Sequence, residues 1–246
     1  SVGIAMAVGM LVTWAGLVPV LTAMHGASGD IAALVDDTFR NDVRFIGAGT
    51  IGVAALWSLL RILGPIIRGI RAAMATADAR KSGQALELTE RDLPISIVGG
   101  TILALLLPIA GLLWVFAADT AIADGIAPVI LGTLVYVLVI GVVIASVCGY
   151  MAGLIGASNS PVSGVGILAV LGAALLLVLA YGRGGTVEQT QALIAYAIFT
   201  TGIVFSIATI SNDNLQDLKT GQLVGATPWK QQVALVIGVV FGSLVI

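Results

Sequence analysis

The sequence predicts an all-α, polytopic integral membrane protein: a bundle of helices in which some segments are broken by glycine and proline. Hydrophobic residues make up 59% of the chain and charged residues only 10%, whereas soluble domains carry roughly 25% charged residues. Mean hydropathy is +1.10. A water-soluble fold could not cover this much apolar surface with so few charges, and the apolar residues fall into long runs of the length that crosses a bilayer.

These runs divide the chain into expected spans within a single transmembrane region, 1–246. The expected spans are residues 2–24, 45–67, 93–117, 128–150, 163–181 and 190–210, followed by a truncated span at 233–246. A full span needs about 20 apolar residues, so the last run is short. Because the sequence also begins inside an apolar run, we expect it to be a fragment of a longer protein.

Two features stand out within the first two spans. Pro19 should kink the first, because proline removes a backbone donor. Gly47, Gly49 and Gly52 in the second match G-x-G-x-x-G, but a dinucleotide site needs a preceding strand and an acidic residue about 20 positions later. Since both are missing, we interpret these glycines as small residues that let helices approach closely. The polar segment between the two spans (25–44) has room for a short interfacial helix at Ile31–Phe39.

Basic residues predict the topology, because they are enriched on the cytoplasmic side. Alternating the spans places 68–92, 151–162 and 211–232 on one side, which we expect to be cytoplasmic, with 68–92 as its main charged loop. The basic residues on that side are Arg68, Arg71, Arg80, Lys81, Arg91, Lys219 and Lys230, and those on the other side are Arg40, Arg44 and Arg183.

Several function classes lack support in the sequence. The net charge is −2, so no nucleic-acid partner is expected. One cysteine (Cys148) and one histidine (His25) provide no metal-type spacing, and no cofactor or metal site is predicted. Recognisable hydrolase motifs such as H-E-x-x-H and G-x-S-x-G are absent, so an enzyme is not expected. His25 could titrate near neutrality, but a lone histidine at the end of a span is usually an interface residue.

A glycine-, serine- and proline-rich block follows the fourth span and carries no charge. It runs from Gly149 to Gly166 and contains Ser158, Asn159, Ser160, Pro161 and Ser163. Irregular backbone at membrane depth is tolerated where protein buries it or a watery cavity borders it, and broken helices of this kind form transporter substrate sites. The block is therefore either part of a solute path or an ordinary tight turn.

The longest strongly polar run, Ser211–Gln232, follows the sixth span directly. Asp213 and Asp217 are four residues apart and would share a face of a continuing helix, with Asn212, Asn214 and Gln216 around them. Carboxylates next to hydrocarbon are costly unless something uses or satisfies them. They could couple transport to protons or cations, with Lys219 as counter-charge, or simply end a helix in water. Gly221 is the expected end of that helix.

These two blocks resemble motifs of the oligopeptide transporter family. Residues 213–228 read DNLQDLKTGQLVGATP, which is similar to that family's D-N-L-Q-D-L-K-T-G-x-L-V-G-A-T-P run, and residues 153–164 read GLIGASNSPVSG, which is similar to its G-L-x-G-x-S-N-x-P-x-S-G block. Phe45–Gly49, with Trp57, Ser58 and Arg61 downstream, is a third similarity. The resemblance looks closer to the bacterial and yellow-stripe-like branch than to the fungal peptide branch.

The resemblance implies a secondary transporter, a proton-coupled symporter for small peptides or peptide-like metal chelates, in a bacterial inner membrane. Its expected partners are that solute, protons, the lipid bilayer and the rest of its own longer chain. Ser158, Asn159, Ser160 and Ser163 are the candidates for the solute path. Asp213, Asp217, Asn212, Asn214 and Lys219 are the coupling candidates. An ion channel or ion-conducting subunit remains the alternative, and an intramembrane enzyme is a weaker one.

Overall fold

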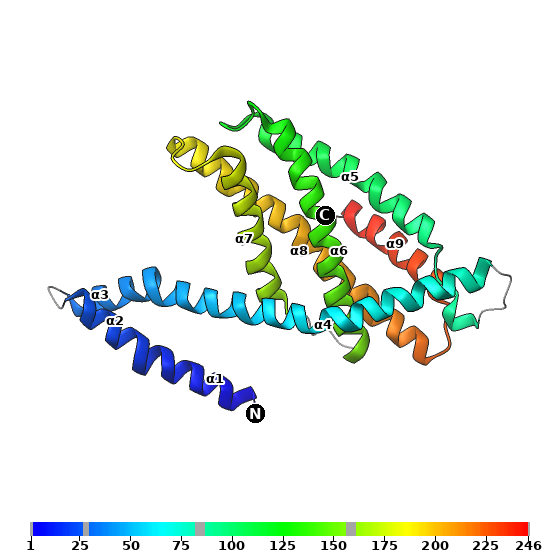
Figure 1. The fold of residues 1–246 in the computed structure, drawn as a ribbon, viewed down its shortest axis with the longest axis horizontal. Helices are drawn as coiled ribbons and strands as arrows, with labels where there is room; N and C mark the ends of the chain where they lie inside the picture. The colour runs from blue at the N-terminus through cyan, green and yellow to red at the C-terminus, as the bar shows by residue number, and fades with distance from the viewer. Residues whose placement is uncertain (1, 27–29, 82–86, 156–160, 246) are drawn as a thin grey trace. The chain divides into compact units, whose positions relative to one another are not determined.

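The fold was analysed in a computed structural model, which describes residues 2–26, 30–81, 87–155 and 161–245. Within those ranges every regular element is helical, so the all-α prediction is confirmed there. The chain divides into two compact units, Ser1–Ala54 and Ala55–Ile246, which are described separately (Figure 1).

The first unit is a hairpin of two helical rods. One rod consists of α1 (Val2–Met10), the π-helical segment η1 (Leu11–Leu17) and α2 (Val18–His25), and the other of α3 (Ile31–Thr38), the π-helical segment η2 (Phe39–Val43) and the start of α4 (Arg44–Lys81). Gly26 ends the first rod with φ of 83°, a conformation that glycine adopts without steric cost. Pro19 is the second residue of α2, two positions after the end of η1. It cannot donate to a carbonyl in the preceding turn, which is where the wider π turn occurs.

The polar segment expected between the first two spans is largely helical. Asp30 begins α3, and its side chain accepts a hydrogen bond from Ala32 N (2.9 Å), which is a standard N-cap. The helix then continues through η2 into α4 instead of stopping as a separate interfacial helix.

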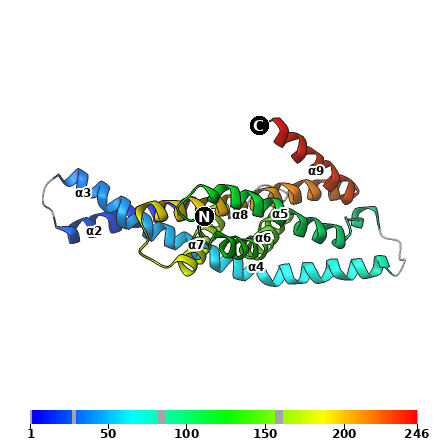
Figure 2. The same cartoon turned by 90° about the horizontal axis from the view of Figure 1, so that it is seen from above.

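The second unit contains the remainder of α4 and a packed group of helices. Its further elements are η3 (Leu88–Glu90), α5 (Ile95–Ala118), α6 (Ile126–Ile155), α7 (Val162–Tyr181), α8 (Val187–Leu223) and α9 (Pro228–Val245). α8 packs along α6 and α7, and α5 lies against α6. Figure 2 shows α9 extending away from the α5–α8 group, and no described residue of α9 is buried.

Small residues set the closest helix contacts in this group. A Cβ atom on Gly149 of α6 would lie 2.8 Å from Ser211 Oγ and 3.0 Å from Leu215 Cγ of α8. On Gly172 of α7, a Cβ atom would lie 2.7 Å from the hydroxyl of Tyr136 of α6. Without a hydrophobic driving force in lipid, close backbone approach of this kind is a main source of helix association.

Two of the three glycines predicted to serve this purpose show no such contact. A Cβ atom on Gly47 or Gly49 would meet no described atom within 4 Å. The third, Gly52, is buried.

Seven helices are long and apolar enough to cross a membrane, so the described chain is a multi-pass integral membrane protein. They are Gly3–His25, Ile31–Gly69, Leu88–Ala118, Ile126–Leu154, Ser163–Tyr181, Val187–Leu223 and Pro228–Val245. Many large apolar side chains on them are exposed, including Leu107 (76%) and Leu179 (87%), as expected for surfaces that face lipid.

Candidate functional site

The polar run after the sixth expected span is part of a helix. α8 extends to Leu223, so residues 211–223 continue the helix, as expected, and the helix ends two residues beyond Gly221. Gly221, the expected end, lies inside this helix and is buried against Gln231 of α9. The four-residue spacing of Asp213 and Asp217 therefore places them on one face, as the sequence predicted.

The buried side of this polar segment anchors it to α6. Ser211 Oγ donates a hydrogen bond to Ala145 O of α6 (2.7 Å). Asn212 is only 6% exposed, and its side-chain amide donates to Asp213 Oδ1 at 3.4 Å. The Ser211 bond joins this part of α8 to α6, whereas the Asn212 bond lies within α8.

The opposite side of the segment presents the two carboxylates. Asp213 and Asp217 are exposed, while Asn214 and Gln216 are half-buried. Lys219 was expected to be their counter-charge, but its Nζ donates to Gln222 Oε1 (3.0 Å). Among the described residues, neither carboxylate takes part in an ion pair.

The broken segment is described only at its edges. α6 ends at Ile155, and Pro161 precedes α7. Ser158, Asn159 and Ser160 lie outside the described residues. Ser163, in the first turn of α7, is exposed.

The structure brings the two sequence-predicted regions towards each other. Gly149, near the end of α6 that leads into the broken segment, lies directly against Ser211 and Leu215 of α8. The polar face of α8 and the approach to the break therefore share one end of the α6–α8 pair. Close packing at Gly149 is what allows this proximity.

The end of the polar run forms a joint with the segment before α5. Trp229 N donates to Arg91 O (3.1 Å). The Gln232 amide accepts from Leu93 N (3.2 Å) and donates to Asp92 Oδ1 (3.3 Å). One glutamine thus bonds a backbone and a side-chain group far away in sequence, so the T-P-W-K-Q-Q part of the run holds the start of α9 in place.

We expect Gln232→Ala to lower the free energy of unfolding by about 1–2 kcal/mol, because it removes two hydrogen bonds worth about 0.5–1.5 kcal/mol each. Denaturation of the detergent-solubilised protein, followed by tryptophan fluorescence, measures this. Gln222→Ala is the matched control, since that amide accepts from Lys219 at the exposed end of α8. Equal stability of the two variants would contradict the joint.

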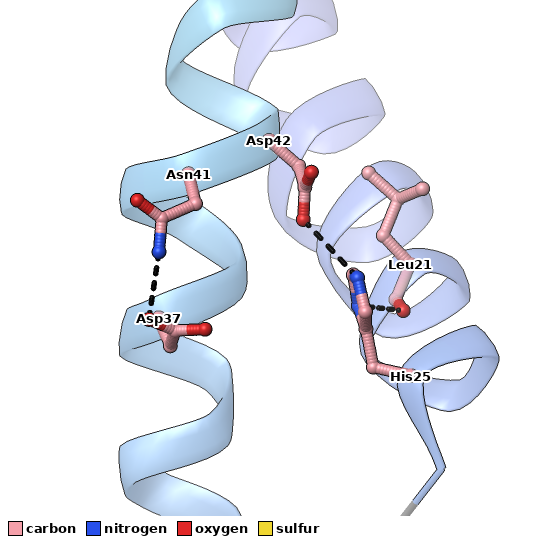
Figure 3. Close-up of polar contacts among 5 residues, drawn as sticks. All are labelled: Leu21, His25, Asp37, Asn41 and Asp42. Atoms are coloured by element: carbon pink, nitrogen blue, oxygen red, sulfur yellow. Dashed lines mark hydrogen bonds and ion pairs between the residues drawn. The ribbon is translucent and has the colours of Figure 1, made fainter.

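A polar cluster in the first unit was not predicted. His25 Nδ1 lies 2.9 Å from Leu21 O, and His25 Nε2 lies 3.6 Å from Asp42 Oδ2 (Figure 3). Sequence reasoning treated His25 as an interface residue. The available signal was its position between a span end and an acidic segment, but the choice of partner among four aspartates needed the structure.

A metal centre finds no support in the described ranges, where no three His, Cys, Asp or Glu side chains are placed to hold an ion.

The comparisons with known proteins agree with the sequence motifs. The family described as "OPT oligopeptide transporter protein" matches residues 1–246. A Haemophilus influenzae protein named "Putative oligopeptide transporter" is 41% identical over 255 residues, which covers 99% of this chain and 39% of the relative. The chain thus spans about two-fifths of the length of that relative. No solved structure matches the chain. With its family motifs, its seven apolar helices and a match along its whole length, the chain belongs to the OPT oligopeptide transporter family.

Proposed function

We propose that this chain forms part of a secondary transporter that moves small peptides or peptide-like metal chelates across a bacterial inner membrane. The observation that carries the proposal is the family match along residues 1–246. It is supported by a relative whose name describes an oligopeptide transporter, and it favours transport over the enzyme alternative.

The solute path in this proposal passes the break between α6 and α7. Ser158, Asn159, Ser160 and Ser163 supply hydroxyl and amide groups that can bond peptide or chelate groups without adding a fixed charge. The close packing of α6 at Gly149 on the polar end of α8 supports this choice, because it brings the end of α6 that leads into the break next to that polar segment.

Coupling to a proton gradient is assigned to Asp213 and Asp217, with Asn212 and Asn214 beside them. A carboxylate can take up and release a proton while its neighbours hold the helix in place. The geometry supports this in two ways: both carboxylates are exposed, and Lys219 is bonded to Gln222 instead of neutralising them.

We expect Asp213→Asn and Asp217→Asn each to reduce gradient-driven uptake by at least about tenfold, a loss typical of a removed proton-transfer group, without reducing membrane insertion. Uptake into proteoliposomes with an imposed pH gradient measures this. Asp124→Asn, in the exposed connection between α5 and α6, is the matched control. Full gradient-driven uptake by both variants would remove these residues from coupling.

The experiment that tests the function is uptake by the full-length protein of a panel of short peptides and metal chelates, with and without a proton gradient. A transporter should saturate with solute concentration and show counterflow. Unsaturable uptake with single-channel currents would indicate a channel and overturn the proposal.

A further inference from the structure

His25 occupies a position that favours a positive charge. It lies in the last turn of α2, immediately before Gly26 ends the helix. Carbonyl groups in the last turn of a helix have no partner within the helix, and the partial negative charge there stabilises cations. His25 Nδ1 lies 2.9 Å from Leu21 O, the carbonyl one turn earlier in α2. Because a carbonyl can only accept, Nδ1 must carry the hydrogen in this contact.

The other ring nitrogen faces a carboxylate from the second rod. His25 Nε2 lies 3.6 Å from Asp42 Oδ2, and Figure 3 shows Asp42 reaching from its helix towards the imidazole. An ionised carboxylate is also an acceptor only. A neutral imidazole has one N–H group and one bare nitrogen, so either tautomer would place a lone pair against an acceptor. Only the imidazolium, with two N–H groups, suits both neighbours.

Most of the surrounding charged groups have bonding partners other than His25. Arg40 Nε pairs with Asp36 Oδ2 (3.0 Å), and the Asn41 amide donates to Asp37 Oδ1 (2.7 Å). Asp30 caps α3 through Ala32 N. The other charged side chain near these groups in sequence is Arg44, at the start of α4, while α1 and η1 contain no titratable side chain. Asp42 is therefore the carboxylate that pairs with His25.

Apolar contacts bring the two rods together independently of this pair. Trp14 of η1 stacks on Phe39 of η2, with ring centroids 5.2 Å apart and planes 13° from parallel. Both residues lie in π-helical segments, which occur frequently at functional sites. The side chains of His25 and Asp42 are 48% and 38% exposed, so water reaches the pair while the stacked rings hold the rods in register.

From this geometry we propose that His25 and Asp42 form a proton-binding site that fastens the end of α2 to η2 when the imidazole is protonated. Histidine changes charge between about pH 5 and 8. At the acidic end of that range the imidazolium donates towards both Leu21 O and Asp42, and this pair holds the end of α2 against η2. At the alkaline end a bare nitrogen faces an acceptor, and the two rods separate at this point. Proton binding here does not depend on the proposed transport activity.

The test uses the full-length protein in liposomes, with spin labels at Met24→Cys and Phe45→Cys in a background without other reactive cysteines. Both positions are well exposed, at 76% and 67%, and flank the pair. Pulsed electron–electron double resonance measures the distance between the two labels. When the pH is lowered from 8 to 5, the population with the short distance should grow about two- to fivefold relative to the population with the long distance, the range expected for an exposed ion pair. No change with pH would overturn the proposal.

Three variants separate the pair from general acidity. His25→Gln and Asp42→Asn should each abolish the pH response, whereas Asp37→Asn, which removes a carboxylate bonded to Asn41 and not to His25, should retain it. A response that persists in either of the first two, or is lost equally in the third, would overturn the proposal. Uptake measured in the same vesicles tests the transport function separately: failure of uptake with an intact pH-dependent distance would count against transport and support the proton site.

Discussion

Replacing Tyr196 by alanine should lower the free energy of unfolding by about 3–5 kcal/mol, the usual cost of truncating a large buried aromatic side chain. Tyr196 is 1% exposed and packs within the cluster formed by α5, α6, α7 and α8. In lipid, apolar transfer contributes little to helix association. The cost therefore arises mainly from lost van der Waals contacts around the cavity, which are individually small and collectively large.

Tyr196→Phe is the matched control, because it keeps the ring and removes only the hydroxyl. That hydroxyl donates to Thr133 Oγ1 of α6 (3.2 Å), and hydrogen bonds between membrane helices average about 0.6 kcal/mol. Denaturation in mixed micelles should therefore separate the two variants by several kilocalories per mole. Similar losses for both would show that the hydroxyl contact, and not the packing, stabilises this cluster.

Gly149→Val should be the most damaging substitution along the α6–α8 contact. Its Cβ would lie 2.8 Å from Ser211 Oγ and 3.0 Å from Leu215 Cγ, so the two helices must move apart or Ser211 must give up its bond to Ala145 O. Overpacking typically costs about 1–3 kcal/mol. The stiff β-branched side chain leaves little room for relief, so we expect the upper end of that range and a reduced yield of folded protein.

Gly202→Val tests whether the effect comes from packing or from valine itself. Gly202 lies in α8, and a Cβ atom there would meet nothing within 4 Å. Thermal unfolding monitored by size-exclusion chromatography should leave Gly202→Val close to the unaltered protein while Gly149→Val unfolds at a lower temperature. Equal unfolding temperatures would mean that α6 and α8 are not closely packed at Gly149. Uptake by Gly149→Val should fall as well, since the same contact holds the end of α6 against the polar segment of α8.

The helices were predictable because the bilayer leaves the backbone few choices. Without water to satisfy N–H and C=O groups, an apolar run crosses the membrane as a helix, and hydropathy alone locates such runs. Hydropathy does not show how far a helix continues in water. Hydropathy therefore did not locate the end of α4 at Lys81 or the end of α8 at Leu223, both of which lie beyond the apolar runs.

The individual side-chain contacts were harder to predict, for identifiable reasons. The shared face of Asp213 and Asp217 was predicted from spacing alone, because residues four apart lie on the same face of a helix. Lys219 bonds Gln222, three residues further along α8. It lies two residues from Asp217 and six from Asp213, and only side chains three or four residues apart face each other on a helix. Asp42, which pairs with His25, lies in the π-helical segment η2. The wider π turn changes the direction in which side chains point, and no simple periodicity in the sequence predicts such a segment.

The length of α8 gives an estimate of how deep its carboxylates lie in the membrane. Its 37 residues extend over roughly 55 Å at 1.5 Å per residue, far more than a hydrocarbon core of about 30 Å. Measured from Glu188 in the first turn, Asp213 lies roughly 38 Å along the axis, at or beyond the far boundary of that core for tilts up to about 40°. With Glu188 at one boundary of the core, both carboxylates would lie at or beyond the other, where protons reach them from one aqueous compartment without crossing hydrocarbon. If these groups couple transport, neighbouring segments must open and close over them, because the helix itself keeps them at a fixed depth.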